Sequence, residues 1–225
     1  MKIKSVIFDL DGTLINTAPD VRLALNHMLS TYHLPAIEPN EIYELLGNGA
    51  KIMLQKIFAK HEQVLSDDEL SRAIACYLAY YQTHPVVETT IYPGVVAGLQ
   101  DLYQSGIQLG ICTNKPAVMT HLVLEQLELK NLFTAIVAGD EIAQPKPHAA
   151  HLQQVLHLMQ MPIKYSVMVG DSQIDKNAAH NANMPFIGAR YGYDAQAFVD
   201  GHLIDSFVQL PIALKQIEEK LGGNL

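Results

Sequence analysis

Residues 4–13 read Lys-Ser-Val-Ile-Phe-Asp-Leu-Asp-Gly-Thr, an apolar run that stops abruptly at two carboxylates, Asp9 and Asp11. The continuous β-branched and aromatic residues before Asp9 are typical of a central strand buried on both faces of a parallel sheet. Asp9 then falls at the carboxyl end of this strand, the edge where ligands bind in open α/β sheets. Gly12 supplies the backbone freedom for a sharp turn. We therefore expect a catalytic strand and turn, with a plain turn between strands as the alternative for this stretch alone.

Two more apolar runs end in polar residues. Residues 109–115 read Leu-Gly-Ile-Cys-Thr-Asn-Lys, and residues 166–171 read Ser-Val-Met-Val-Gly-Asp, with Ser172 and Asp175 just beyond. Lys146 stands between these runs and is flanked by prolines. Each feature alone has an ordinary explanation as a turn or a surface residue. Their order and their placement at strand ends favour a shared catalytic role.

Composition limits the class of protein. The 225 residues are 49% hydrophobic and 17% charged, which describes a globular protein with ample core material. A formal net charge of -8 argues against general nucleic-acid binding, because phosphate backbones need clustered Lys and Arg. Asp9 and Asp11 interrupt the short N-terminal apolar run, so we expect neither a signal peptide nor a membrane span. The two cysteines, Cys76 and Cys112, fall in unrelated patterns, and the cytoplasm is the expected compartment.

Residues from about 16 to 84 read as helices with no strand among them. Apolar residues recur there at helical spacing, Ser66 and Glu69 form a capping box, and Thr17 is placed to cap the first helix. An ordinary crossover between parallel strands needs only about a dozen residues with one helix. The pattern therefore predicts an inserted all-helical cap domain, residues 16–84, placed over the active-site edge of the sheet.

Helices and strands alternate from residue 85 onward, which predicts a Rossmann-like, doubly wound parallel sheet of the α/β class. The core domain would comprise residues 1–15 and 85–225. The expected strands are residues 107–112, 135–138, 166–169 and 186–188, and the expected helices are residues 95–104, 118–127, 148–159, 175–183 and 211–221.

Taken in order, four features resemble the motifs of the haloacid-dehalogenase-like superfamily. They are Asp-x-Asp-Gly-Thr at residues 9–13, the strand-end Thr113, Lys146 before a proline, and Gly-Asp-Ser-Gln-Ile-Asp at residues 170–175. Nearly the whole chain is covered by the resemblance. Within the superfamily, further stretches are similar to phosphoglycolate phosphatases, namely residues 46–50, 113–116, 139–141, 146–148, 170–172 and 191–193.

The resemblance implies hydrolysis of a phosphomonoester through an aspartyl-phosphate. Asp9 is the candidate nucleophile, and Asp11 would protonate the leaving alkoxide and then take a proton from water. Thr113, Asn114 and Lys146 are candidates for binding the phosphoryl group and stabilising its charge in the transition state.

A divalent metal is needed because the carboxylate of Asp9 must meet a phosphate dianion. Its ligands would be oxygens only, which suits Mg²⁺. Asp9 and Asp171 would be side-chain ligands, the resemblance adds the backbone carbonyl of Asp11, and Asp175 would act indirectly or through water. His148 and His151 share a helix face but have no third ligand, so a metal site there is a weak alternative.

The cap carries a second candidate binding element, Gly47-Asn48-Gly49-Ala50-Lys51. Two glycines one residue apart let the backbone approach a ligand closely, and the first amides of the following helix attract anions. Gly47, Asn48, Gly49 and Lys51 are therefore predicted to contact the part of the substrate that is not phosphate. Equally, these glycines could only break one helix and start another.

Three readings of function follow. The leading one is a Mg²⁺-dependent phosphatase for a small phosphorylated acid such as 2-phosphoglycolate. The expected partner is thus a small phosphorylated metabolite. The second keeps this chemistry for a sugar phosphate or a nucleotide, or returns the phosphoryl group to sugar as in a β-phosphoglucomutase. The third is a non-catalytic protein on a retired enzyme fold, against which the intact set of candidate residues argues. The oligomeric state is left open.

Overall fold

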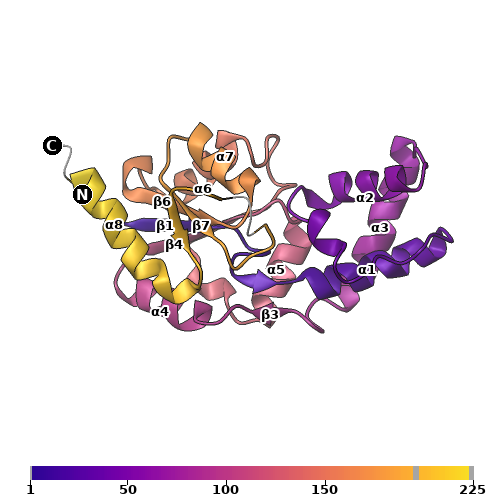
Figure 1. Cartoon of the computed structure of the whole chain (residues 1–225), viewed down its shortest axis with the longest axis horizontal. Coiled ribbons are helices and arrows are strands. Elements are labelled where there is room, and N and C mark those ends of the chain that lie inside the picture. Colours follow the sequence, from indigo (N-terminus) through magenta and orange to yellow (C-terminus); the bar gives the residue numbers. More distant parts are fainter. Residues whose placement is uncertain (1, 195–197, 223–225) are drawn as a thin grey trace.

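The computed structural model describes residues 2–194 and 198–222, and its core is a six-stranded parallel sheet (Figure 1). The order across the sheet is β5-β4-β1-β6-β7-β8, so β1 lies in the middle between β4 and β6. All neighbouring pairs are parallel. The predicted doubly wound α/β fold is confirmed. The strands are β1 (Ser5–Phe8), β4 (Gln108–Cys112), β5 (Ala135–Val137), β6 (Ser166–Gly170), β7 (Phe186–Ala189) and β8 (His202–Ile204).

Strand β1 is buried along its whole length and divides two hydrophobic clusters. Val6 and Phe8 point into the cluster covered by α4, α5 and α8, whereas Ile7 points into the cluster covered by α6 and α7. This alternation is the period of a strand with helices on both faces. The helices are α4 (Val95–Gln104), α5 (Ala117–Gln126), α6 (Ala149–Met159), α7 (Gln173–Asn181) and α8 (Leu210–Gly222).

The segment between β1 and α4 is mainly helical, and its helices gather at one end of the molecule (Figure 1). They are α1 (Ala18–Thr31), α2 (Gly49–Lys60) and α3 (Asp67–Thr83), with a short 3₁₀ helix, η1 (Ile42–Glu44). The predicted capping box of Ser66 and Glu69 begins α3. Two short antiparallel strands, β2 (Ile15–Asn16) and β3 (Thr90–Ile91), pair where the chain leaves the sheet and where it returns. The exact domain boundaries stay a prediction.

The carboxylate of Asp20 fastens the base of this helical segment. It is 1% exposed and accepts hydrogen bonds from the backbone amides of Val87, Glu88 and Thr89 and from the Thr89 hydroxyl, at 2.7 to 3.1 Å. The outgoing and returning chains are thus tied together by one buried anion. Among the described residues, no helix is long and apolar enough to span a bilayer.

Candidate active site

Asp9 follows directly after β1, at the carboxyl edge of the sheet. Its backbone amide donates to the Val169 carbonyl at 2.9 Å, which continues the pairing with β6 and fixes the direction of the side chain. Only 7% of the residue is exposed. Its Oδ1 lies 2.8 Å from the ammonium Nζ of Lys146. The sequence prediction that places Asp9 at a strand end is confirmed.

Lys146 reaches this site from the loop between β5 and α6. Its side chain is 1% exposed, and Nζ also lies 2.6 Å from Oδ1 of Asp175. Burial alone lowers the pKa of Lys146, but the carboxylates of Asp175 and Asp9 outweigh burial and raise it. The lysine is therefore charged at neutral pH and lies between two carboxylates.

His151 holds the backbone of Lys146 in place. Its Nδ1 accepts a hydrogen bond from the Lys146 amide at 3.1 Å, so its proton lies on Nε2, which donates to the Val137 carbonyl at 3.1 Å. Burial and the nearby Lys146 lower the pKa of His151 to about 4. His148 caps α6 instead, because its Nδ1 accepts from the Ala150 amide. Both imidazoles thus have structural partners, and His151 supports a candidate catalytic residue that sequence reasoning did not connect with it.

Three carboxylates meet beside this lysine. Asp9, Asp171 and Asp175 each offer an oxygen within 4.8 Å of the other two, and all three are buried. Burial and the Asp175 charge raise the pKa of Asp9 to about 7, although Lys146 opposes the shift, and burial raises the pKa of Asp171 well above its usual range. The single charge of Lys146 cannot compensate all three carboxylates in their ionised form, which is why these pKa values rise. A divalent cation with oxygen ligands fits this set on charge and on donor type.

Asp171 and Asp175 are held by different partners. Asp171 accepts from the Thr13 hydroxyl at 2.9 Å and from the Tyr193 amide at 2.8 Å. Asp175 closes a capping box with Ser172 at the start of α7, and its second oxygen takes the Lys146 contact. Asp175 already caps the N-terminus of α7 and pairs with Lys146, so it is less free than Asp171 to bind a cation directly.

Asp11 lies on the turn that follows β1. Gly12 has a φ of +87°, and a Cβ at this position would collide with the Asp171 carboxylate, so the tight turn requires glycine. The hydroxyl of Thr17 donates to Oδ1 of Asp11 at 2.6 Å. Thr17 therefore does not cap α1 with its side chain, which corrects the sequence expectation, because this hydroxyl is used by Asp11 instead.

Thr113, Asn114 and Lys115 follow β4 and point to three different places. Thr113 is 2% exposed and borders the same cavity as Asp9. The Asn114 amide donates to the carbonyls of Gly47 and Lys146, both at 3.0 Å, and so joins the helical segment to the Lys146 loop. Lys115 reaches Asp11, with Nζ at 3.1 Å and 3.2 Å from its two oxygens.

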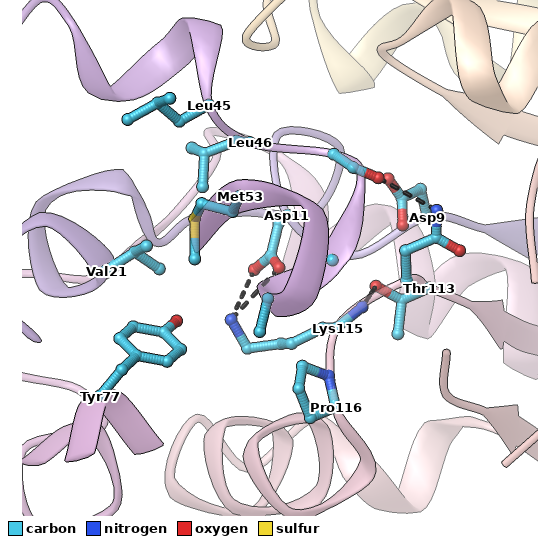
Figure 2. Close-up of a pocket in the computed structure, with 14 residues that line it drawn as sticks. Asp9, Asp11, Val21, Leu45, Leu46, Met53, Tyr77, Thr113, Lys115 and Pro116 are labelled. Carbon is cyan, nitrogen blue, oxygen red and sulfur yellow. Dashed lines mark hydrogen bonds and ion pairs between the residues drawn. The ribbon is translucent and has the colours of Figure 1, made fainter. Parts of the chain in front are cut away.

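Two adjoining cavities meet at Asp9 and Asp11. The first, about 50 Å³, has Thr113 and Lys115 on the core side and apolar side chains on the helical side (Figure 2). The second, about 430 Å³, extends past Asp171.

Of the residues predicted to contact the substrate from the cap, Gly47 lines both cavities, Gly49 lines the first and Asn48 lines the second. Lys51 is exposed and lies outside both linings. The apolar side chains of the first cavity include Val21, Leu45, Leu46, Met53 and Tyr77.

Besides His151, which supports Lys146, sequence reasoning missed two residues that bind these carboxylates, Lys115 and Tyr193. Lys115 stands next to Thr113 and Asn114 in the quoted motif, but a lysine after a strand end carries no sign that it reaches Asp11. Tyr193 lies in the Tyr-Gly-Tyr stretch of residues 191–193, which carries no catalytic residue type that would mark it as part of the site. Its amide binds Asp171 and its hydroxyl accepts from the backbone amides of Thr17 and Ala18.

The fold is an open α/β sheet, and its carboxyl edge is where ligands bind in such folds. A buried carboxylate cluster lies at this edge beneath helices, an arrangement typical of an α/β enzyme. Residues 6–189 match the family described as haloacid dehalogenase-like hydrolase. The chain belongs to this family and is a phosphatase.

Relatives cover almost the whole chain. The phosphoglycolate phosphatase of Colwellia psychrerythraea is 35% identical over 94% of this chain and 96% of its own. That of Agrobacterium fabrum is 36% identical over 92% and 91%. A crystal structure of "a predicted phosphoglycolate phosphatase" from Haemophilus somnus superposes with a TM-score of 0.86 at 30% identity, over 94% of this chain and 98% of the other.

Proposed function

We propose that this phosphatase is a Mg²⁺-dependent phosphomonoester hydrolase for a small phosphorylated acid, with 2-phosphoglycolate as the leading candidate. The observation that carries the proposal is the Asp9 carboxylate at the end of β1, 2.8 Å from the Lys146 ammonium and beside the Asp171 carboxylate. The names of the relatives support the choice of substrate.

Asp9 is assigned as the nucleophile. Its carboxylate oxygen forms a bond to phosphorus while the bond from phosphorus to the ester oxygen breaks, which gives an aspartyl-phosphate and an alkoxide. Asp11 in its acid form gives its proton to that alkoxide. As a carboxylate, Asp11 then takes a proton from the water that attacks phosphorus, so phosphate leaves and Asp9 is restored.

Thr113 and Lys146 are assigned to the transferring phosphoryl group. The Thr113 hydroxyl and nearby backbone amides can donate to its oxygens, and the charged Lys146 can stabilise the negative charge that accumulates on them. Asn114 holds the Lys146 loop through its carbonyl, so it contributes to the geometry even where it does not contact phosphate.

Asp9 and Asp171 would hold Mg²⁺ through their side chains and Asp11 through its backbone carbonyl. The hydrogen bonds of Asp175 to Ser172 and its ion pair with Lys146 favour the indirect role. When bound, the cation would neutralise the charge that otherwise keeps a phosphate dianion away from three carboxylates.

The helical segment of residues 16–84 is proposed as a cap over this site, inserted into a core of residues 1–15 and 85–225. The Asn114 bond to Gly47 and the cavity lined by both parts support the placement of the helical segment over the site. The loop Gly47-Asn48-Gly49 is proposed to contact the substrate beyond its phosphate.

A substrate panel tests the function. Purified protein would be given 2-phosphoglycolate, sugar phosphates, nucleoside monophosphates and glucose 1-phosphate, each with Mg²⁺ and with EDTA, and both phosphate release and the organic product would be measured. We expect Mg²⁺-dependent release with the highest kcat/KM on 2-phosphoglycolate. A preference for a sugar phosphate or a nucleotide would replace the substrate, and conversion of glucose 1-phosphate to glucose 6-phosphate would indicate a mutase. The absence of any turnover would favour the non-catalytic alternative.

A further inference from the structure

The helical segment contributes no lysine or arginine to the lining of the first cavity, among the residues that the structure describes. Among the described residues, Lys115 is the one lysine or arginine in the lining of either cavity, whereas both linings contain Asp9 and Asp11. Lys146 lies beneath Asp9 and is already paired with two carboxylates. A substrate with a second negative group would therefore meet one side-chain cation in these linings, Lys115, which has one carboxylate partner where Lys146 has two.

Lys115 is built into this position rather than free on the surface. Its side chain is 4% exposed, and its ammonium donates to both oxygens of Asp11 and, at 3.0 Å, to the hydroxyl of Tyr81 on α3. Figure 2 shows the Lys115 ammonium turned toward Asp11, on the side where Val21 and Tyr77 project. These contacts hold the ammonium where the helical segment meets the core, and a substrate carboxylate would take the place of one of these acceptors.

The chemistry of the proposed substrate places its carboxylate near this ammonium. In 2-phosphoglycolate, the carbon that carries the ester oxygen is bonded directly to the carboxylate carbon. Asp11 must come within hydrogen-bond distance of that ester oxygen to protonate it. A cation that already contacts both oxygens of Asp11 therefore lies within reach of the neighbouring carboxylate.

We propose that Lys115 determines substrate specificity by binding the carboxylate of the phosphorylated acid. The proposal rests on the proposed function and names the group that recognises its acid class. Without Lys115, a carboxylate in this cavity would face apolar side chains and the carboxylates of Asp9 and Asp11, which is unfavourable both by desolvation and by repulsion. A phosphate ester with no second charge gains nothing from Lys115 beyond the orientation of Asp11.

The test compares three substrates on Lys115→Met. 2-Phosphoglycolate has a carboxylate and a poor leaving group, ethyl phosphate has the same length and a poor leaving group but no carboxylate, and 4-nitrophenyl phosphate has a good leaving group. We expect the ratio of kcat/KM for 2-phosphoglycolate to that for ethyl phosphate to fall about 100-fold, mainly through KM, as for a lost buried charge pair. Equal losses on these two esters, with the aryl ester spared, would mean that Lys115 only orients Asp11 and would overturn the proposal.

A binding measurement keeps the test independent of catalysis and of partial misfolding. Glycolate should inhibit the hydrolysis of 4-nitrophenyl phosphate by the wild type, and about 10-fold or more weakly in Lys115→Gln, which keeps a polar group without the charge. Unchanged inhibition would overturn the assignment. Lys56→Met, on an exposed position of α2, is the matched control, and selectivity lost in Lys51→Met instead would move the carboxylate site to the cap loop.

The two proposals fail in different ways. A wild type that hydrolyses 2-phosphoglycolate and ethyl phosphate equally well would contradict the acid as the substrate class, and the role of Lys115 with it. A wild type that prefers 2-phosphoglycolate, and whose preference survives Lys115→Met, would contradict only the role of Lys115.

Discussion

At the scale of single residues, Asp9 allows chemistry to be separated from folding. Burial and neighbouring charge raise its pKa to about 7, so the folded protein gains little from ionising this group. Asp9→Asn should therefore abolish turnover while the melting temperature stays within a few degrees of the wild type, as Lys146 keeps Asp175 as a partner. Phosphate release in Mg²⁺ and thermal unfolding by circular dichroism would measure both. Appreciable hydrolysis by the purified variant would remove Asp9 from the role of nucleophile.

His151 gives a residue-scale prediction about pH. Its pKa falls from 6.5 to about 4 on folding, so the unfolded chain binds a proton between these values and the folded chain does not. Its contribution to the free energy of unfolding is thus present above about pH 6.5 and is lost as the pH falls toward 4, by up to about 3 kcal/mol.

The variant His151→Asn isolates this contribution. Asparagine can still accept from the Lys146 amide but does not titrate, and the opposing titration of Asp9 and Asp171 is common to both proteins. Urea unfolding at a series of pH values should show a steeper loss of stability on acidification in the wild type. Parallel pH profiles would mean that folding does not lower the pKa of His151.

At the scale of elements, the backbone at the first residue of α2 requires glycine for structural reasons alone. Gly49 has a φ of +79°, and a Cβ there would lie 3.0 Å from the Asn114 carbonyl oxygen. Gly49→Val should therefore strain the backbone by about 1 to 3 kcal/mol and separate α2 from the loop after β4, which lowers kcat/KM for 4-nitrophenyl phosphate. The loss should be larger for 2-phosphoglycolate, because this loop is proposed to contact the part of the substrate beyond its phosphate. Kinetics on both esters and thermal unfolding would check this.

Asn48→Ala is the companion variant for the same loop, because it removes a polar side chain that borders the second cavity without changing a glycine. A selective loss on 2-phosphoglycolate, in either variant, would support a direct contact between this loop and the substrate. Losses shared by both esters would assign the two glycines to the structure of the cap.

At the scale of the whole molecule, metal binding should be coupled to stability. The carboxylates of Asp9, Asp171 and Asp175 repel one another in the folded state, and the unfolded chain does not hold the three together, so a cation that binds them favours folding. Mg²⁺ added to EDTA-treated protein should raise the melting temperature. At a Mg²⁺ concentration of 100 times its dissociation constant, the free energy of unfolding should increase by about 2.7 kcal/mol. The effect should grow as the pH rises through about 7, where Asp9 loses its proton.

Asp171→Ala should remove most of this stabilisation together with turnover, since it takes away a predicted ligand. Differential scanning calorimetry at several Mg²⁺ concentrations would measure it. Asp200→Ala, at an exposed carboxylate paired with Lys176, is the matched control. An equal Mg²⁺ response in wild type and Asp171→Ala would contradict the assigned site.

Much of the architecture could be predicted from sequence because its signals are local. The apolar run before Asp9, the alternation after residue 85 and the capping box at Ser66 each depend on neighbours in the chain, and the structure has the corresponding strand, sheet and helix. Strands β2, β3 and β8 were not predicted, because two or three residues hold too short a pattern to stand out from a loop.

What the sequence alone determined was the sheet, the mainly helical segment between β1 and α4 and the strand-end location of Asp9, Thr113 and Asp171, because hydrophobic period and turn residues encode them along the chain. Only the tertiary structure decided which side chains meet. The bond from Thr17 to Asp11, the support of Lys146 by His151 and the contact of Lys115 with Asp11 and Tyr81 join distant or differently directed segments. Such partners are chosen by where folded elements converge and by the need of buried charges for hydrogen bonds, and neither leaves a periodic pattern in the sequence.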